Sequence, residues 1–118
     1  MREILFRGKR VDNGEWIEGF FAKSGDKTFI LIDTGIAFGY VTMKEVLSET
    51  IGQYTGLTDK NGRKIFEGDI LEGEITSIRG FVEYDFAQAG YYVRSFATNI
   101  CYLLMEDTWC QMGTIYEN

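Results

Sequence analysis

The stretch ETIGQYTGLTDKNGRKIFEGDIL, residues 49–71, decides the fold of this chain. Near its centre, Asn61 and Gly62 form a pair that tolerates the positive φ angles of a tight hairpin turn. Gly56 and Gly62 are expected at positive φ, and Gly68 allows a bulge or a sharp bend. The stretch therefore predicts extended strands joined by tight turns.

The same signals occur on both sides of this stretch. Upstream, Asp12-Asn13-Gly14 places a second Asn-Gly pair between strand-like runs, and downstream residues 81–86 alternate apolar and acidic side chains. Val, Ile and Thr total 27 residues against 12 for Leu and Ala, a composition typical of strands. We predict one mainly β domain over residues 1–118, a small barrel or sandwich, with subdomains 1–48 and 49–118.

One short helix at most is expected, where the two subdomains meet. Thr42 stands three residues before Glu45, the spacing of a capping box, and Val46 and Leu47 follow. Gly52 and the β-branched residues before it stop such a helix after a turn or two.

The composition excludes several kinds of chemistry. The chain has no His and two Cys, which excludes His-dependent triads and CxxC metal or redox motifs. No phosphate-binding glycine loop occurs. We therefore assign no catalytic, cofactor-binding or metal-binding residue, and we do not expect an enzyme. A carboxylate enzyme built on Glu67, Asp69 or Glu72 stays open as a minor alternative.

Charge is unevenly distributed along the chain. The net charge is -6, with +1 over residues 1–64 and -7 over residues 65–118. Arg7, Lys9 and Arg10 form a basic segment near the start. It is either a solvated strand edge or a set of phosphate contacts, so the alternative function is a small nucleic-acid-binding barrel that uses this strand.

The last third of the chain is rich in aromatic residues, among them Tyr91, Tyr92, Phe96 and Trp109. These rings either fill a helix-poor core or form an exposed interaction surface. Composition does not decide between the two. The second interpretation predicts a homo-oligomer or a protein partner.

Two segments resemble a known family. Residues 1–21 and, more specifically, the run GQYTGLTDKNGRKIFEGDI within residues 49–71 closely resemble the YopX-like family of small phage and prophage proteins of bacteria. The resemblance implies a mostly β protein with a small SH3-like barrel in the C-terminal part. It implies no established activity, cofactor or catalytic residue. One departure is Ser48, where relatives often have a proline.

Together these observations predict a non-catalytic phage or prophage accessory protein. We expect a β module that self-associates or binds a phage or host protein in the bacterial cytoplasm. No run is long and apolar enough for a membrane span or a signal peptide, so no membrane association is expected.

Overall fold

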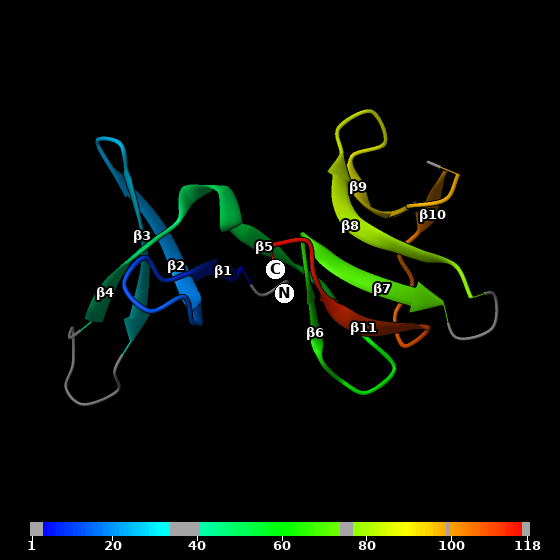
Figure 1. Cartoon of the computed structure of the whole chain (residues 1–118), viewed down its shortest axis with the longest axis horizontal. Helices are drawn as coiled ribbons and strands as arrows, with labels where there is room; N and C mark the ends of the chain where they lie inside the picture. Colours follow the sequence, from blue (N-terminus) through cyan, green and yellow to red (C-terminus); the bar gives the residue numbers. More distant parts are fainter. Residues whose placement is uncertain (1–3, 34–40, 74–76, 99, 117–118) are drawn as a thin grey trace. The chain divides into compact units, whose positions relative to one another are not determined.

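The computed structural model describes residues 4–33, 41–73, 77–98 and 100–116. The chain divides into two compact units, Met1–Gln53 and Tyr54–Asn118 (Figure 1). Across the described residues the secondary structure is strand apart from one 3-10 turn, η1 (Ser48–Thr50). All strand pairings are antiparallel, so the expectation of a mainly β protein is confirmed.

The N-terminal unit is a meander of four strands in the order β4-β3-β2-β1. Its strands are β1 (Phe6–Lys9), β2 (Trp16–Ser24), β3 (Lys27–Asp33) and β4 (Val41–Val46). The predicted turn joins β1 to β2, with Gly14 at φ 72° and the Asn13 side chain accepting a hydrogen bond from the Glu15 N–H at 2.9 Å. Ile30 and Val46 are the most buried apolar side chains of this unit.

No helix begins at Thr42, so the predicted start was wrong, but the limit of one short helix holds because η1 is a single 3-10 turn. Residues 41–46 form β4, which pairs with β3 over six residues from Asp33↔Val41 to Thr28↔Val46. A capping pattern is a weak local preference, and burial of Val46 together with the β3 hydrogen bonds outweighs it.

The C-terminal unit contains most of β5 (Gly52–Thr58) and a five-stranded sheet in the order β10-β9-β8-β7-β11. The other strands are β6 (Lys64–Phe66), β7 (Asp69–Gly73), β8 (Arg79–Asp85), β9 (Gly90–Ser95), β10 (Cys101–Leu103) and β11 (Trp109–Thr114). Its core consists of Ile65, Leu71, Val82, Val93, Leu104 and Trp109.

The SH3-like barrel is not confirmed. The edge strands β10 and β11 of the five-stranded sheet do not pair with each other, and no sheet of the described residues closes into a barrel. β10 has only three residues, and β11 is interrupted by a register shift between Gln111 and Gly113. Both features limit the ladder that closure would need.

The backbone of residues 49–71 follows the turn chemistry of its glycines. Gly56, Gly62 and Gly68 have φ angles of 89°, 80° and 92°, which confirms the positive values expected for the first two and a sharp bend at the third. Across the described part of the chain, no helix is long and apolar enough to cross a membrane.

Candidate functional site

The alternation of side chains along β9 separates the aromatic residues singled out in the sequence. Tyr91 packs against the buried core of the C-terminal unit, whereas Tyr92, the next residue, lies on the opposite face of the sheet. Trp109 is 7% exposed and belongs to the core. Phe96, just beyond β9, is 54% exposed. The four aromatic residues therefore do not form one surface.

The face that carries Tyr92 is here called the C-terminal outer face. Register places Tyr92 beside Glu83 and Leu103, and it places Arg94 beside Phe81. Glu83 and Arg94 form an ion pair that includes a side-chain hydrogen bond. This hydrogen bond raises the pKa of Arg94 above its ordinary value, although burial acts in the opposite direction. The charged pair makes this face mixed rather than apolar.

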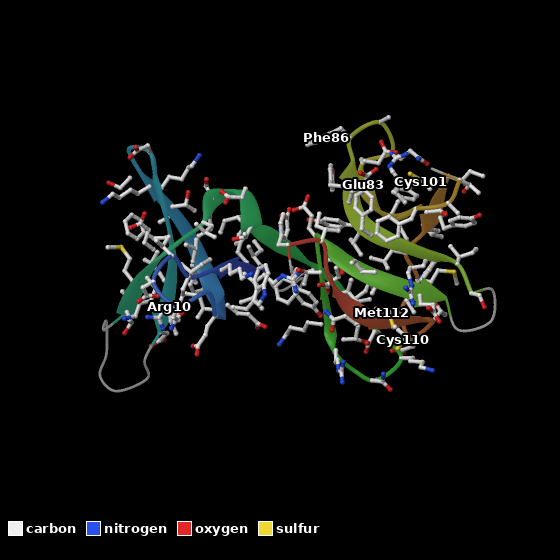
Figure 2. All side chains as sticks on the ribbon, in the orientation of Figure 1. Arg10, Glu83, Phe86, Cys101, Cys110 and Met112 are labelled. Atoms are coloured by element: carbon white, nitrogen blue, oxygen red, sulfur yellow. The ribbon has the colours of Figure 1, made fainter. Side chains whose placement is uncertain are left out.

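The loop after β8 carries the most exposed large apolar side chain of the described residues. Phe86 is 88% exposed, and Figure 2 shows it projecting at the end of β8. Its ring meets that of Tyr84 edge-on at 4.9 Å. A single exposed ring of this kind is common on proteins and does not define a binding surface.

A more continuous apolar surface lies on the N-terminal unit, where sequence reasoning had placed none. Phe20, Leu31 and Met43 are register partners across β2, β3 and β4, so their side chains form a row on one face. Val41 lies on the same face, two residues from Met43 along β4. Phe20, Met43 and Val41 are 61%, 57% and 54% exposed, and Leu31 is half-buried. We call these four residues the N-terminal apolar face.

A sequence signal for this face existed. Neighbouring residues of a strand point to opposite faces, so one of Phe20 and Phe21 had to face away from the core. Phe21 lies on the face that carries buried Ile30; its ring packs on Phe6 at a centroid distance of 5.5 Å, and the residue remains 39% exposed. Which of the two faced outward depended on the strand register.

The three predicted phosphate contacts are not gathered on one open surface. Arg7 is 7% exposed, and its guanidinium lies over the Trp16 ring, 4.7 Å from the centroid. Lys9 is half-buried. Arg10 makes a two-bond ion pair with Asp12, at 2.9 and 2.7 Å.

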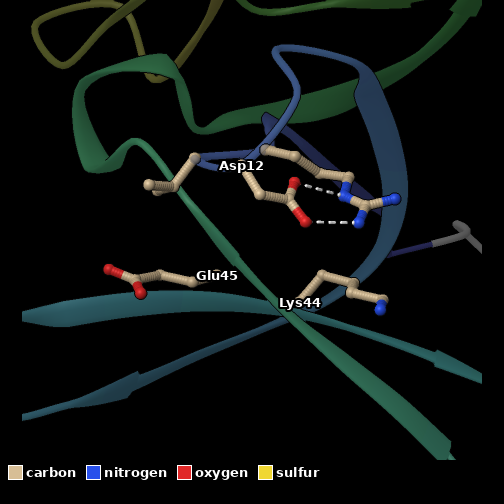
Figure 3. A pocket seen from close by; sticks show the side chains of 5 residues that line it. Asp12, Lys44 and Glu45 are labelled. Atoms are coloured by element: carbon tan, nitrogen blue, oxygen red, sulfur yellow. Dashed lines mark hydrogen bonds and ion pairs between the residues drawn. The ribbon is translucent and has the colours of Figure 1, made fainter.

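That ion pair lies in a shallow pocket of about 250 Å³ (Figure 3). The hydrogen bond between the two side chains raises the pKa of Arg10 and lowers that of Asp12. Lys44 and Glu45 extend from β4 in opposite directions beside it. With two cations and two anions among its lining residues, the pocket presents no net charge to a phosphate.

Two buried carboxylates of residues 49–71, Asp59 and Asp69, accept backbone hydrogen bonds, and Glu72 just beyond them forms an ion pair. Buried Asp69 accepts a hydrogen bond from the Phe66 N–H at 2.8 Å, and Glu72 pairs with Arg79 at 2.9 Å. Asp59, also buried, accepts the N–H groups of Asn61 and Arg63 within its turn. Within the described ranges, no three His, Cys, Asp or Glu side chains are grouped so that they could hold a metal ion.

A protein-family model matches this chain. The family model described as YopX protein matches residues 5–118, nearly the whole chain, and this confirms the resemblance drawn from the sequence. No curated protein matches the sequence.

Proposed function

The chain belongs to the YopX family, and we propose that it is a non-catalytic β module that binds protein, either a second copy of itself or a phage or host protein. The observation that carries the proposal is the N-terminal apolar face. Phe20, Met43 and Val41 are each more than half exposed and lie together on one face of the sheet. Clustered exposure of this kind is typical of interaction surfaces.

The chemistry of the acidic residues also supports a role without catalysis. Asp59 and Asp69 are buried and accept backbone hydrogen bonds, so neither is open to a substrate in this arrangement. Glu72 is partly exposed, but it pairs with Arg79 on the surface. These roles favour a binding module over a carboxylate enzyme.

The proposed setting follows from the family. We place this protein among phage and prophage accessory proteins that act in the bacterial cytoplasm. Nucleic-acid binding is less favoured, because Arg7 is buried with its guanidinium against the Trp16 ring and Arg10 forms an ion pair with Asp12.

Affinity capture tests the proposal. A tagged full-length chain is expressed in bacteria together with an untagged copy, and the recovered proteins are compared for the wild type, Met43→Ser and Phe86→Ser. Phe86 is a matched control because its ring is even more exposed but lies outside the N-terminal apolar face. We expect Met43→Ser to reduce recovery of the bound protein at least tenfold and Phe86→Ser to leave it unchanged.

Circular dichroism of each purified variant establishes that it is folded. Recovery of no protein by the wild type, including the untagged copy, contradicts the proposal. Equal recovery by the wild type and a folded Met43→Ser variant contradicts the choice of surface.

A further inference from the structure

The edge strand β4 presents an open backbone edge next to the N-terminal apolar face. On the side away from β3, Glu45 C=O accepts the Val11 N–H at 3.1 Å and Leu47 N–H donates to Lys9 C=O at 2.8 Å. Backbone groups of alternate strand residues point the same way, so Val41 and Met43 also direct their N–H and C=O groups to that side. Within the described residues, no backbone hydrogen bond reaches Val41 or Met43 there.

Among the described residues, the usual protections of an edge strand are not found on the short segment 41–43. Natural edges are blunted by charged side chains, proline, bulges or a covering loop. Val41, Thr42 and Met43 carry no charge and no proline, and they pair with β3 in unbroken register. The outward side chains, Val41 and Met43, are both more than half exposed.

We propose that a second copy of this chain occupies this edge, with the two β4 strands pairing antiparallel about a two-fold axis at Thr42. This inference rests on the proposed protein-binding function and names the partner. In that register Val41 of one copy faces Met43 of the other, and the outward N–H and C=O groups of both residues exchange backbone hydrogen bonds. The same contact occurs twice, which makes the interface isologous.

Side-chain chemistry matches this register. Val41 and Met43 lie on the same face of the sheet, so the pairing joins the Phe20–Leu31–Met43 row of one copy to Val41 of the other. The pairing thus brings the Val41 and Met43 side chains of the two copies together on one face, with Asp33, the register partner of Val41, beside them. A short edge that is complementary to itself favours a second copy over an unrelated peptide.

The net charges of the two units favour the N-terminal unit as the site of self-association. Residues 1–53 contain seven Lys or Arg against eight Asp or Glu, whereas residues 54–118 contain five against ten. Two N-terminal units therefore meet at net charges near zero, but pairing through the C-terminal unit brings together two units of net charge -5. The β11 edge is also covered, because Trp109 C=O and Gln111 N–H bond to residues 60 and 59.

The contact is small, and this sets its expected strength. Pairing over three residues with one apolar row buries less than the roughly 1,200–2,000 Å² of a stable interface. We therefore expect a dimer that dissociates at about micromolar concentration.

Charge-swap variants of the full-length chain test the register. Val41→Glu and Met43→Lys each place a charge on the outer face, away from the buried core. We expect each variant alone to weaken dimerisation at least tenfold in sedimentation-velocity titrations. An equimolar mixture should regain dimer, because the new glutamate of one chain faces the new lysine of the other. Leu103→Glu, which changes a residue 61% exposed on edge strand β10, is the matched control and should dimerise like the wild type.

Three results overturn the inference. One is a wild type that stays monomeric at about 100 μM, well above the concentration at which a small interface is expected to form. The others are dimerisation that survives Val41→Glu, and a mixture of the two variants that stays monomeric. If the wild type captures another protein and Met43→Ser abolishes that capture, the proposed function stands while this inference fails. If the wild type captures no other protein either, both fail.

Discussion

Replacing Asp59 should show that the recognisable stretch of this chain is used for folding. The side chain is fully buried, and its carboxylate accepts the N–H groups of Asn61 and Arg63, both at 2.9 Å, and of Gln111 at 3.2 Å. It therefore both shapes the turn before β6 and ties that turn to edge strand β11. In Asp59→Ala all three donors lose their acceptor.

The size of the effect follows from these contacts. Asn61 and Arg63 are exposed, so water replaces part of what their N–H groups lose, and each lost bond costs about 1 kcal/mol. The sum for three bonds is about 3 kcal/mol. A total stability of about 6–18 kcal/mol is typical for this length, so the variant should stay folded. Its melting temperature should fall by about 12 °C.

The pH dependence supplies an independent test of the same carboxylate. Burial alone raises the pKa of Asp59, but the N–H groups of Arg63, Gln111 and Asn61, with the Arg63 charge, outweigh it and hold the pKa below its ordinary value. The ionised form then stabilises the fold above pH of about 4, the ordinary value for Asp, and this contribution is lost as pH falls through the lowered pKa.

Thermal unfolding of the wild type, Asp59→Ala, Asp59→Asn and Asp12→Ala at pH 7 and pH 3 measures both effects. Asp12 is the control, because it also accepts hydrogen bonds near a hairpin turn but is exposed, and its loss should leave the melting temperature nearly unchanged. Wild type and Asp59→Asn should converge in acid. A shift below about 3 °C for Asp59→Ala at pH 7, or an Asp59→Asn deficit that is undiminished at pH 3, would refute the reasoning.

Two further predictions follow from individual residues. Gly68→Ala should destabilise the fold by about 1–3 kcal/mol, since φ is 92° and an added Cβ would lie 2.8 Å from Tyr116 Cε2. Gly25→Ala, where φ is 64° and no atom lies within 4 Å of an added Cβ, should lose less stability in the same urea titration. Equal losses in the two variants would show that contact with Tyr116 does not contribute. Fluorescence anisotropy with labelled DNA and RNA at low salt should show no binding, because Arg10 is held by Asp12; salt-sensitive binding that Arg10→Ala abolishes would reverse that conclusion.

The outer edges of β11 and β4 are covered by backbone hydrogen bonds to different extents. In the C-terminal unit, the Asp59 turn covers β11 with hydrogen bonds from the Lys60 N–H to Trp109 and from Gln111 to Asp59. In the N-terminal unit, the backbone bonds that the described residues make to the outer edge of β4 are Val11 N–H to Glu45 and, just past the strand, Leu47 N–H to Lys9. The edge of β11 is thus covered and the edge of β4 partly open, and with the lower net charge of the N-terminal unit this is why the proposed partner is placed on β4.

Local chemistry decided the features that the amino-acid sequence predicted correctly. Asn-Gly turns and positive-φ glycines depend on the backbone preferences of one or two residues, so the bends at Gly14, Gly62 and Gly68 could be read before any contact was known. Absence of His likewise excluded its chemistry without reference to a fold.

Tertiary structure alone decided what these strands expose. Thr42 lies in a strand because β3 offers it a pairing partner, which a local capping pattern cannot anticipate. Trp109 is buried and Phe20 exposed because each sheet has one face against its core, and only the register determines which residues face it. Register depends on contacts between residues far apart along the chain, so the apolar face and the open edge of β4 emerge only once the strands are paired.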